Sequence, residues 1–496
     1  MRSPITLLKK FSSYFLLVLV LCSYSGFSQT TLSAGDIIIT IIQCDGTDEF
    51  RFIPLVDLEE NTIIYFTDNG WQSDDTFRAN EGIVKYTAPG GGVNKGTMIT
   101  YTGISGDFST ENAGFNLSGS GDQVLAYQGS TISPTFIFAV QNNSTQWQTG
   151  SDDANQSDLP SGLINDVTAV AVGAGTGAES EYDNAYYSGA STGKTHTQIS
   201  VLVGNSSNWT GDNDTTYSST PPTSFTFSSA TWDGSNSTSW GTAANWSSSE
   251  SPGKYDDVII ADVLNDPDIT TNVTLEDITI QSGAILDINS TGSLTLTDDF
   301  TNSSGTVNLN SAADHFPAIK VAGDASGNIT YYRYVNPVGT NEWDLIGSPV
   351  DGLAILTFAT TNALTGTATL ATNGTGQYAI GVYDNSDDSW TNYSSGTLSG
   401  AGNFDIGKGY AMASVSGGTG LLAFTGTIAT TDQTQAIIDN DAANSGSGRR
   451  WSLIANPFPS FVNANDDADG SNNFLTVNTS KLHDTYEAVY GYDADG

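Results

Sequence analysis

Short alternating runs of apolar residues, separated by Gly, Asn and Asp, recur along nearly the whole chain. Such runs are typical of β-strands that turn alternate side chains toward a core, with turns between them. One segment, Thr195–Gly204, instead has apolar residues at helical spacing and a terminal Gly, which predicts a short helix. We therefore expect an all-β protein with one short helix.

Residues 1–29 have the pattern of a signal peptide. Lys9 and Lys10 precede an apolar run from Tyr14 to Cys22, and small or polar residues follow. That run is shorter than the roughly 20 residues that a membrane span needs, and no later stretch approaches this length. We expect a secreted or outer-surface protein with no transmembrane segment. Removal of the leader leaves Cys44 as the only cysteine, which excludes an internal disulfide.

The charge balance limits the classes of partner. The chain has 54 acidic and 15 basic residues and a net charge of −39 at pH 7. So few cations cannot neutralise a phosphate backbone, and nucleic acid is not an expected partner. The same charge repels anionic polymers and membranes unless calcium bridges them. Glycans or other surface polymers are the expected partners.

Pattern changes divide the mature chain into four parts. We expect a β-sandwich with the helix (30–227), a Trp-rich cap with a β-solenoid-like segment (228–315), a β-sandwich-like repeat (316–442) and an incomplete second repeat (443–496). In the second part, apolar pairs recur eight residues apart, which favours successive edges of a solenoid; an antiparallel meander is the alternative. These pairs are Ile278/Ile280, Leu286/Ile288 and Leu294/Leu296.

The two repeats rest on one recurring motif. WDLIGSPV begins at Trp343 and WSLIANPF at Trp451, and an aromatic-rich strand begins 35 residues after each tryptophan, at 378–385 and 486–496. Agreement of motif and spacing indicates duplication. The first copy continues well beyond its aromatic strand. We therefore expect the second repeat to be incomplete at residue 496 and the natural protein to be longer.

One acidic loop has the spacing of a calcium site. Asn465, Asp467 and Asp469 supply oxygens at positions 1, 3 and 5, with Gly470 at position 6. Position 12 is Thr476 instead of Glu, so the expected Ca²⁺ site is weak or completed from elsewhere. The alternative is a tight turn, where Asp and Asn are common for backbone reasons. Further acidic clusters are Asp384, Asp387 and Asp388, and Asp493 and Asp495.

Three tryptophans within fifteen residues form the candidate ligand-binding set. Trp232, Trp240 and Trp246 can stack on sugar rings if they are exposed in a groove. The alternative is that they bury their area and cap the open end of the solenoid, which we favour.

We assign no catalytic residue. His196, His315 and His483 lie far apart in sequence, and neither a GxSxG nor an HExxH context is present. The run 173–178 matches GxGxx(G/A), but the segment that follows lacks a helical apolar stripe, so we expect a glycine loop instead of a dinucleotide site. The 54 acids single out no carboxylate pair for glycoside hydrolysis.

Several strings resemble known secreted proteins. The segments Gly35–Trp71, Gly121–Gly129 and Pro134–Ala139 resemble an N-terminal β-sandwich module of large secreted bacterial proteins and, more loosely, a lamin-tail-like domain. Trp232–Asp262 and the two WxLIxxP motifs resemble surface proteins exported by the type IX secretion system. The resemblance implies this architecture and export route, and it transfers no catalytic residue.

These observations favour a non-catalytic surface protein that adheres, binds or spaces, with glycans or surface polymers as partners. Two alternatives stay open. One is a catalytic or accessory part of a polysaccharide-active enzyme, and the other is a calcium-stabilised structural spacer.

Overall fold

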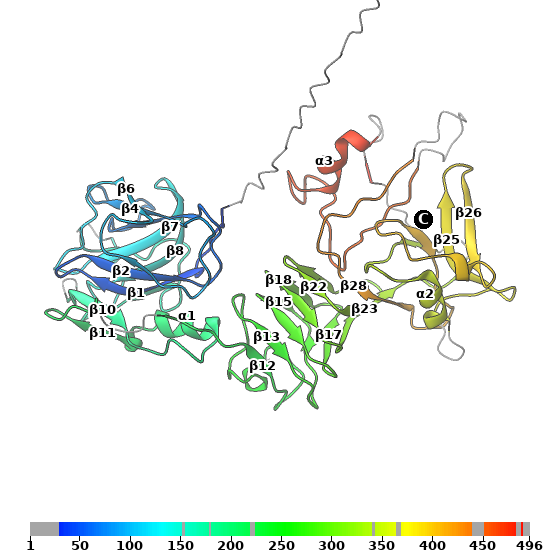
Figure 1. The fold of residues 1–496 in the computed structure, drawn as a ribbon, viewed down its shortest axis with the longest axis horizontal. Helices are drawn as coiled ribbons and strands as arrows, with labels where there is room; N and C mark the ends of the chain where they lie inside the picture. Colours follow the sequence, from blue (N-terminus) through cyan, green and yellow to red (C-terminus); the bar gives the residue numbers. More distant parts are fainter. Residues whose placement is uncertain are drawn as a thin grey trace, which may run out of the picture.

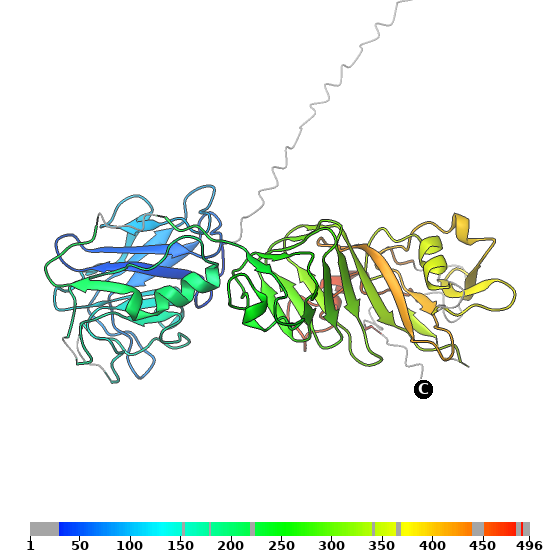
Figure 2. The ribbon, with the colours of Figure 1, turned by 90° about the horizontal axis from the view of Figure 1, so that it is seen from below.

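The computed structural model describes residues 29–150, 154–177, 180–218, 224–339, 343–363, 369–438, 451–482 and 488–489. Three β-rich parts follow one another in a row, with the N-terminal sandwich at one end and the solenoid in the middle (Figures 1 and 2). Strands outnumber helices throughout, so the predicted all-β class is confirmed. No helix in the described ranges is long and apolar enough to cross a membrane.

The N-terminal part is a sandwich of two sheets. The first contains β1 (Ile37–Gln43), β2 (Glu49–Pro54), β5 (Ile99–Tyr101), β10 (Asn184–Tyr187) and β11 (Trp209–Asp212), in the order β11-β10-β1-β2-β5. The second contains β3 (Ile63–Thr67), β4 (Ile83–Thr87), β6 (Phe108–Asn112), β7 (Gln123–Ser130), β8 (Ser133–Gln141) and β9 (Ala169–Ala171), in the order β6-β4-β3-β7-β8-β9. An aromatic core that includes Phe50, Phe52 and Phe66 fills the space between the sheets.

The predicted helix is present as α1 (His196–Gly204), followed by the 3-10 turn η1 (Ser206–Asn208). Thr195 caps it: its Oγ1 accepts from the Gln198 backbone N–H, and the Gln198 side chain accepts from the Thr195 N–H. The helix packs on β1. Because both faces of β1 are therefore covered, this strand is apolar at nearly every position and does not alternate.

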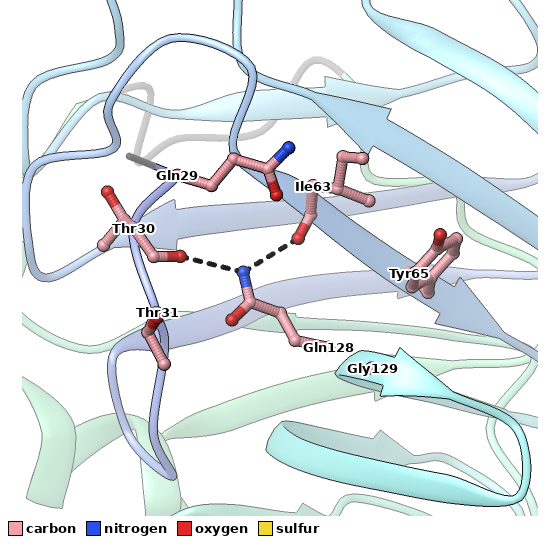
Figure 3. Close-up of a pocket in the computed structure, with 7 residues that line it drawn as sticks. All are labelled: Gln29, Thr30, Thr31, Ile63, Tyr65, Gln128 and Gly129. Carbon is pink, nitrogen blue, oxygen red and sulfur yellow. Dashed lines mark hydrogen bonds between the residues drawn. The ribbon is translucent and has the colours of Figure 1, made fainter. Parts of the chain in front are cut away.

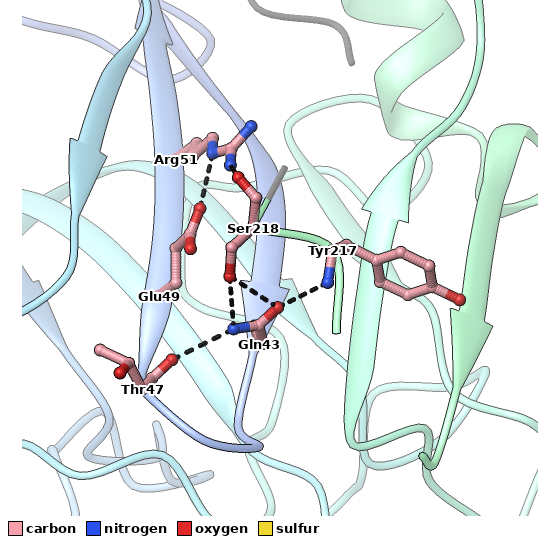
Figure 4. A network of polar contacts seen from close by, with 6 residues as sticks. All are labelled: Gln43, Thr47, Glu49, Arg51, Tyr217 and Ser218. Atoms are coloured by element: carbon pink, nitrogen blue, oxygen red, sulfur yellow. Dashed lines mark hydrogen bonds and ion pairs between the residues drawn. The ribbon is translucent and has the colours of Figure 1, made fainter. Parts of the chain in front are cut away.

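The segment after β11 is held by side chains of the inner strands β1 and β2 (Figure 4). The Tyr217 N–H donates to Gln43 Oε1 at 2.7 Å, and the Arg51 guanidinium donates to the Ser218 carbonyl. Arg51 also pairs with Glu49 at 2.6 Å inside the protein. Phe225 belongs to the sandwich core and Phe227 packs against that core, so the chain stays with the sandwich up to these residues.

The middle part is a β-solenoid of about 3 turns whose strands stack in three parallel ladders. Its strands are β12 (Ala230–Trp232), β13 (Val258–Ile260), β14 (Asp268–Ile269), β15 (Asn272–Leu275), β16 (Ile278–Ile280), β17 (Ile285–Asn289), β18 (Ser293–Leu296), β19 (Phe300–Asn302), β20 (Thr306–Asn310), β21 (Ala318–Val321), β22 (Ala325–Ser326) and β23 (Asn328–Tyr334). The three ladders are β12-β13-β16-β19-β22, β14-β17-β20-β23 and β15-β18-β21.

The register explains the spacing of the apolar pairs. The pairs at 278/280, 286/288 and 294/296 are the three sides of one turn, on β16, β17 and β18. Each side stacks on the same side of the next turn, so that Leu286 meets Val307 and Ile288 meets Leu309. The solenoid is confirmed, and it extends beyond the predicted limit of residue 315, because β21, β22 and β23 continue its ladders.

The C-terminal part has one four-stranded antiparallel sheet in the order β24-β27-β25-β26. Its elements are β24 (Asp344–Ile346), α2 (Ile355–Asn362), β25 (Gln377–Asp384), β26 (Ser389–Ser394), η3 (Leu398–Gly400), β27 (Tyr410–Met412), β28 (Leu421–Thr427), α3 (Phe474–Asn478) and η5 (Thr479–Lys481). β28 pairs with β23, which continues a solenoid sheet, and α2 packs on β28. The helix α2 has no counterpart in the sequence prediction.

The second WxLIxxP motif packs on the first repeat. The Gly409 N–H donates to the Leu453 carbonyl at 3.0 Å, and the Ala455 N–H donates to Gly407 at 2.9 Å. Pro459 accepts from Ile319 of the solenoid at 2.8 Å. Residues 451–459 therefore contact both the first repeat and the solenoid through their backbone, and Ile454 forms an isolated bridge with Lys408. The aromatic strand predicted at 486–496 lies almost wholly outside the described residues.

Candidate functional site

The three candidate tryptophans are buried at the start of the solenoid. Trp246 meets Trp232 and Trp240 edge-on, with ring centroids 5.0 and 4.7 Å apart. The Trp232 Nε1–H donates to the Asn265 carbonyl and the Trp246 Nε1–H to the Trp240 carbonyl. The 3-10 turn η2 (Ala243–Asn245) leads into Trp246. All three rings are buried in the solenoid core, which agrees with the cap interpretation and leaves no open groove at these rings for a sugar.

The candidate calcium loop is a hydrogen-bonded turn. Asp469 Oδ1 accepts from the backbone N–H groups of Ser471 and Asn472 at 3.0 and 2.9 Å, and these bonds lower the pKa of Asp469. The Asn465 carbonyl accepts from the Asp469 N–H, and its side-chain amide donates to Asp467. Within the described ranges no three His, Cys, Asp or Glu side chains converge as a metal site. The geometry favours the turn.

The described histidines do not form a catalytic set. His196 is buried and stacks on Phe227, and burial lowers its pKa to about 3. His315 is exposed and pairs with the neighbouring Asp314 at 2.7 Å. His483 lies outside the described residues. The glycine run at 173–177 is a loop whose Gly175 carbonyl accepts from Thr145, and no helix begins there.

One end of the sandwich holds a loop with three carboxylates. The consecutive backbone N–H groups of residues 116–118 donate to Asp68 at 2.7 Å, Asp48 at 3.0 Å and Asp122 at 2.8 Å. Burial raises the pKa of all three acids, and that of Asp68 reaches about 6. These carboxylates act as fixed acceptors that hold a loop in place.

A seam of polar contacts joins the sandwich to the solenoid. Asp36, buried at the start of β1, accepts from the Lys254 amine at 2.9 Å and from the Tyr255 hydroxyl at 2.6 Å. Burial and the Asp36 charge both raise the pKa of Tyr255. The Lys254 amine also lies 4.9 Å from the Tyr255 ring centre.

In a second contact of the seam the sandwich supplies the cation and the solenoid supplies the carboxylates. Lys95 of the sandwich places its amine 2.8 Å from Glu276 and 3.4 Å from Asp257 of the solenoid. Burial lowers the pKa of Lys95, but the two carboxylates outweigh it and the net shift is upward. Burial raises the pKa of Glu276 to about 7 although Lys95 opposes the rise.

The N-terminus of α1 completes the seam. The Thr197 N–H donates to Asp256 Oδ1 at 3.0 Å, and the Gln198 amide donates to the Ser248 carbonyl at 2.9 Å. Asp256 also accepts from the Gly253 N–H at 2.8 Å. A carboxylate at this end of a helix is stabilised by the unpaired N–H groups and the helix dipole. The solenoid therefore supplies an acidic cap to a helix of the sandwich.

The hairpin β25–β26 presents two aromatic rings at the far end of the molecule from the sandwich (Figures 1 and 2). Tyr383 and Trp390 are cross-strand partners with ring centroids 5.2 Å apart. Trp390 is 49% exposed. A Cβ on Gly381 would stand 3.4 Å from Trp390 Cε3, so the indole lies over this glycine.

Carboxylates surround the tip of this hairpin. The Tyr383 hydroxyl donates to Asp388 at 2.9 Å, and burial together with this bond raises the pKa of Tyr383 to about 12. Asp384 accepts from the Ser386 N–H at 2.8 Å, and Asp387 accepts from the Ser389 hydroxyl at 2.5 Å. The acidic cluster predicted at 384–388 is thus a hairpin turn beside an exposed aromatic pair.

The family model described as "Domain of unknown function (DUF8693)" matches residues 231–490. The chain belongs to the DUF8693 family. No curated protein and no solved structure matches the chain. The DUF8693 region begins inside β12 and contains the solenoid, the hairpin β25–β26 and one side of the seam. The partners Asp36, Lys95 and α1 lie outside the DUF8693 region, in the sandwich.

A shallow pocket of about 250 Å³ lies on the sandwich, outside the DUF8693 region (Figure 3). Gln128 lines it, but its amide is fully used: Nε2 donates to the Thr30 and Ile63 carbonyls, and Oε1 accepts from Leu32. The pocket therefore holds the N-terminal segment and brings together no reactive groups.

Sequence reasoning missed both the seam and the exposed aromatic pair. Lys95 and Glu276 lie 181 residues apart, and no local pattern joins them. Tyr383 and Trp390 were visible as aromatic residues on either side of the turn Asp384–Asp388, and an alternating strand on each side is the signal that pairs them.

Proposed function

We propose that the protein is a non-catalytic secreted or cell-surface module that holds a glycan-binding surface at a fixed distance from its N-terminal domain. Its location rests on the leader pattern of residues 1–29, and export by the type IX secretion system rests on resemblance alone. The lamin-tail-like assignment of the sandwich has the same basis.

The seam between the sandwich and the solenoid is the observation that carries this proposal. Its two sets of ion pairs have opposite polarity: Lys254 reaches back to Asp36, and Lys95 reaches forward to Glu276. Such a crossed arrangement penalises rotation and separation, because either motion leaves partly buried charges without partners. The third part is joined to the solenoid by backbone pairing, because β28 lies antiparallel to β23 in the same sheet.

The surface charge fits a binder of uncharged polymer. With 54 acids and 15 bases the chain repels polyanions. The buried polar side chains of the sandwich and the seam cap a helix, hold turns or form ion pairs. These are structural roles, as expected of a scaffold. The adhesive and spacer roles are thus combined in one rigid body.

Small-angle X-ray scattering of the mature chain tests the proposal. We expect an elongated particle whose profile fits one rigid body, and a Lys95→Ala/Lys254→Ala variant that fits only a mixture of orientations. Lys85→Ala is the matched control, because Lys85 pairs with Glu111 inside one sheet at 3.8 Å. A wild-type profile that requires freely moving domains would overturn the spacer role, and release of reducing sugar from a polysaccharide would overturn the non-catalytic role.

A further inference from the structure

The hairpin β25–β26 has the features of a binding platform for one kind of ligand. Trp390 is the exposed member of a cross-strand aromatic pair, and its ring lies over Gly381, which is buried beneath it. A methyl group at position 381 would already touch the indole at 3.4 Å, so a side chain larger than that of alanine would displace the ring. The glycine thus allows the indole to lie against the strand, with its other face turned outward.

The groups around the rings are mainly hydrogen-bond acceptors. Asp384, Asp387 and Asp388 are all exposed at the tip, and each has a second carboxylate oxygen besides the one that accepts from Ser386, Ser389 or Tyr383. The Lys408 charge contributes a little to the lowered pKa of Asp384, but the Lys408 amine itself is paired with Asp405 at 3.2 Å. The site therefore combines a flat aromatic face with a rim of acceptors and negative charge.

We infer that this hairpin, comprising Tyr383, Gly381, Trp390 and the carboxylates of Asp384–Asp388, is a binding site for neutral pyranose units of a polysaccharide. The C–H face of a pyranose ring is apolar with slightly positive hydrogens, and it complements the negative face of an indole ring. Its hydroxyl groups are donors that suit carboxylate acceptors. Uronates and sulfated sugars are excluded by like charge. This inference rests on the proposed function and names its ligand class.

Affinity electrophoresis of the mature chain tests the site. The gels contain hydroxyethyl cellulose, dextran, alginate or polylysine, and a gel without polymer gives the reference mobility. We expect retardation in at least one neutral gel and none in alginate. Trp390→Ala should weaken that binding by about tenfold or more, as removal of a central tryptophan does at other interfaces. Phe461→Ala is the matched control, because Phe461 is 76% exposed in the same half of the chain and lies outside the hairpin.

A second variant keeps both aromatic rings. Gly381→Val adds two methyl groups to a Cβ that would already lie 3.4 Å from the indole, so it should displace the ring and weaken binding while circular dichroism stays unchanged. The site is overturned if Trp390→Ala binds as the wild type does, or if no neutral gel retards the chain. Retardation in the alginate gel overturns the neutral-sugar assignment, and so does retardation in the polylysine gel with none in a neutral gel. None of these results alters the scattering profile, so a failure of the site is distinct from a failure of the spacer role.

Discussion

The Lys95 amine lies 2.8 Å from a carboxylate oxygen of Glu276, and this contact places a cation of the sandwich on the acidic edge of the solenoid. At that edge an acid directly precedes four of the five strands of the ladder β12-β13-β16-β19-β22, namely Asp257, Asp277, Asp299 and Asp324. The Asp299 N–H donates to Asp277, and the Asp324 N–H donates to Asp299, both at 2.7 Å. This row of acids gains hydrogen bonds from backbone N–H groups, but it also brings negative charges close together. The Lys95 amine partly offsets that charge.

Removal of Lys95 should destabilise the junction. Lys95→Ala leaves Glu276 and Asp257 near each other without their cation, so we expect a loss of about 1–2 kcal/mol in the free energy of unfolding, between the values for exposed and buried pairs. Urea denaturation monitored by tryptophan fluorescence measures it. Lys85→Ala should change little, and an equal loss in that control would contradict a specific role for the seam.

Stability should rise as the pH falls from about 7.5 to 5.5. The pKa values of Asp68 and Asp183 are raised to about 6 and that of Glu276 to about 7, mainly by burial. The folded state therefore binds protons at these three carboxyl groups more tightly than the unfolded chain does. As the pH falls through these pKa values, the carboxylates become neutral and the cost of keeping them charged in the folded protein disappears. His196, with its pKa lowered to about 3, opposes the trend below its ordinary value of 6.5.

Thermal unfolding across this pH range checks the sign. Asp183→Asn removes one of the raised carboxylates and should flatten the rise. A melting temperature that falls steadily from pH 7.5 to 5.5 would show that the histidine or other groups dominate.

The solenoid cap should be sensitive to truncation. Trp246→Ala removes a fully buried ring that touches both other tryptophans, and we expect a loss of about 3–5 kcal/mol. The far-UV signal of the solenoid should be lost at a lower temperature than in the wild type. A variant that melts with the wild type would mean that the cap is dispensable.

The loop at 465–470 should not mediate a calcium effect. Because Asp469 already serves backbone N–H groups, Asp467→Asn should leave any calcium-dependent shift in melting temperature unchanged. Titration with millimolar CaCl₂ compares the two proteins. A shift present in the wild type and absent in Asp467→Asn would restore the loop as a metal site.

Local patterns predicted the strands well because their signals lie within a few residues. The pairs at 278/280, 286/288 and 294/296 identified three sides of one turn, since each side must bury alternate residues. The Thr195 cap and Gln198 located α1 by the same kind of short-range rule. The three tryptophans were correctly favoured as a cap because so much apolar area in so few residues needs burial.

Long-range relationships could not be obtained in this way. Lys95 and Glu276 are brought together by the packing of two domains, which no periodicity encodes. The helix α2 has no side-chain cap at Ala354 and contains three threonines, so its sequence lacks the usual helix signals. The acids at 384–388 were grouped with the candidate calcium loop by composition alone. Their spacing gives no information about the ring pair beside them, which only the pairing of β25 with β26 reveals.

Distance measurement between two spin labels tests the rigid-spacer account most directly. Ile132→Cys on the sandwich and Leu264→Cys on the solenoid are at exposed positions, whereas the natural Cys44 is buried. Double electron–electron resonance should give a single narrow distance distribution that broadens when Lys95 and Lys254 are replaced by Ala. A broad distribution in the protein with both lysines intact would contradict the account.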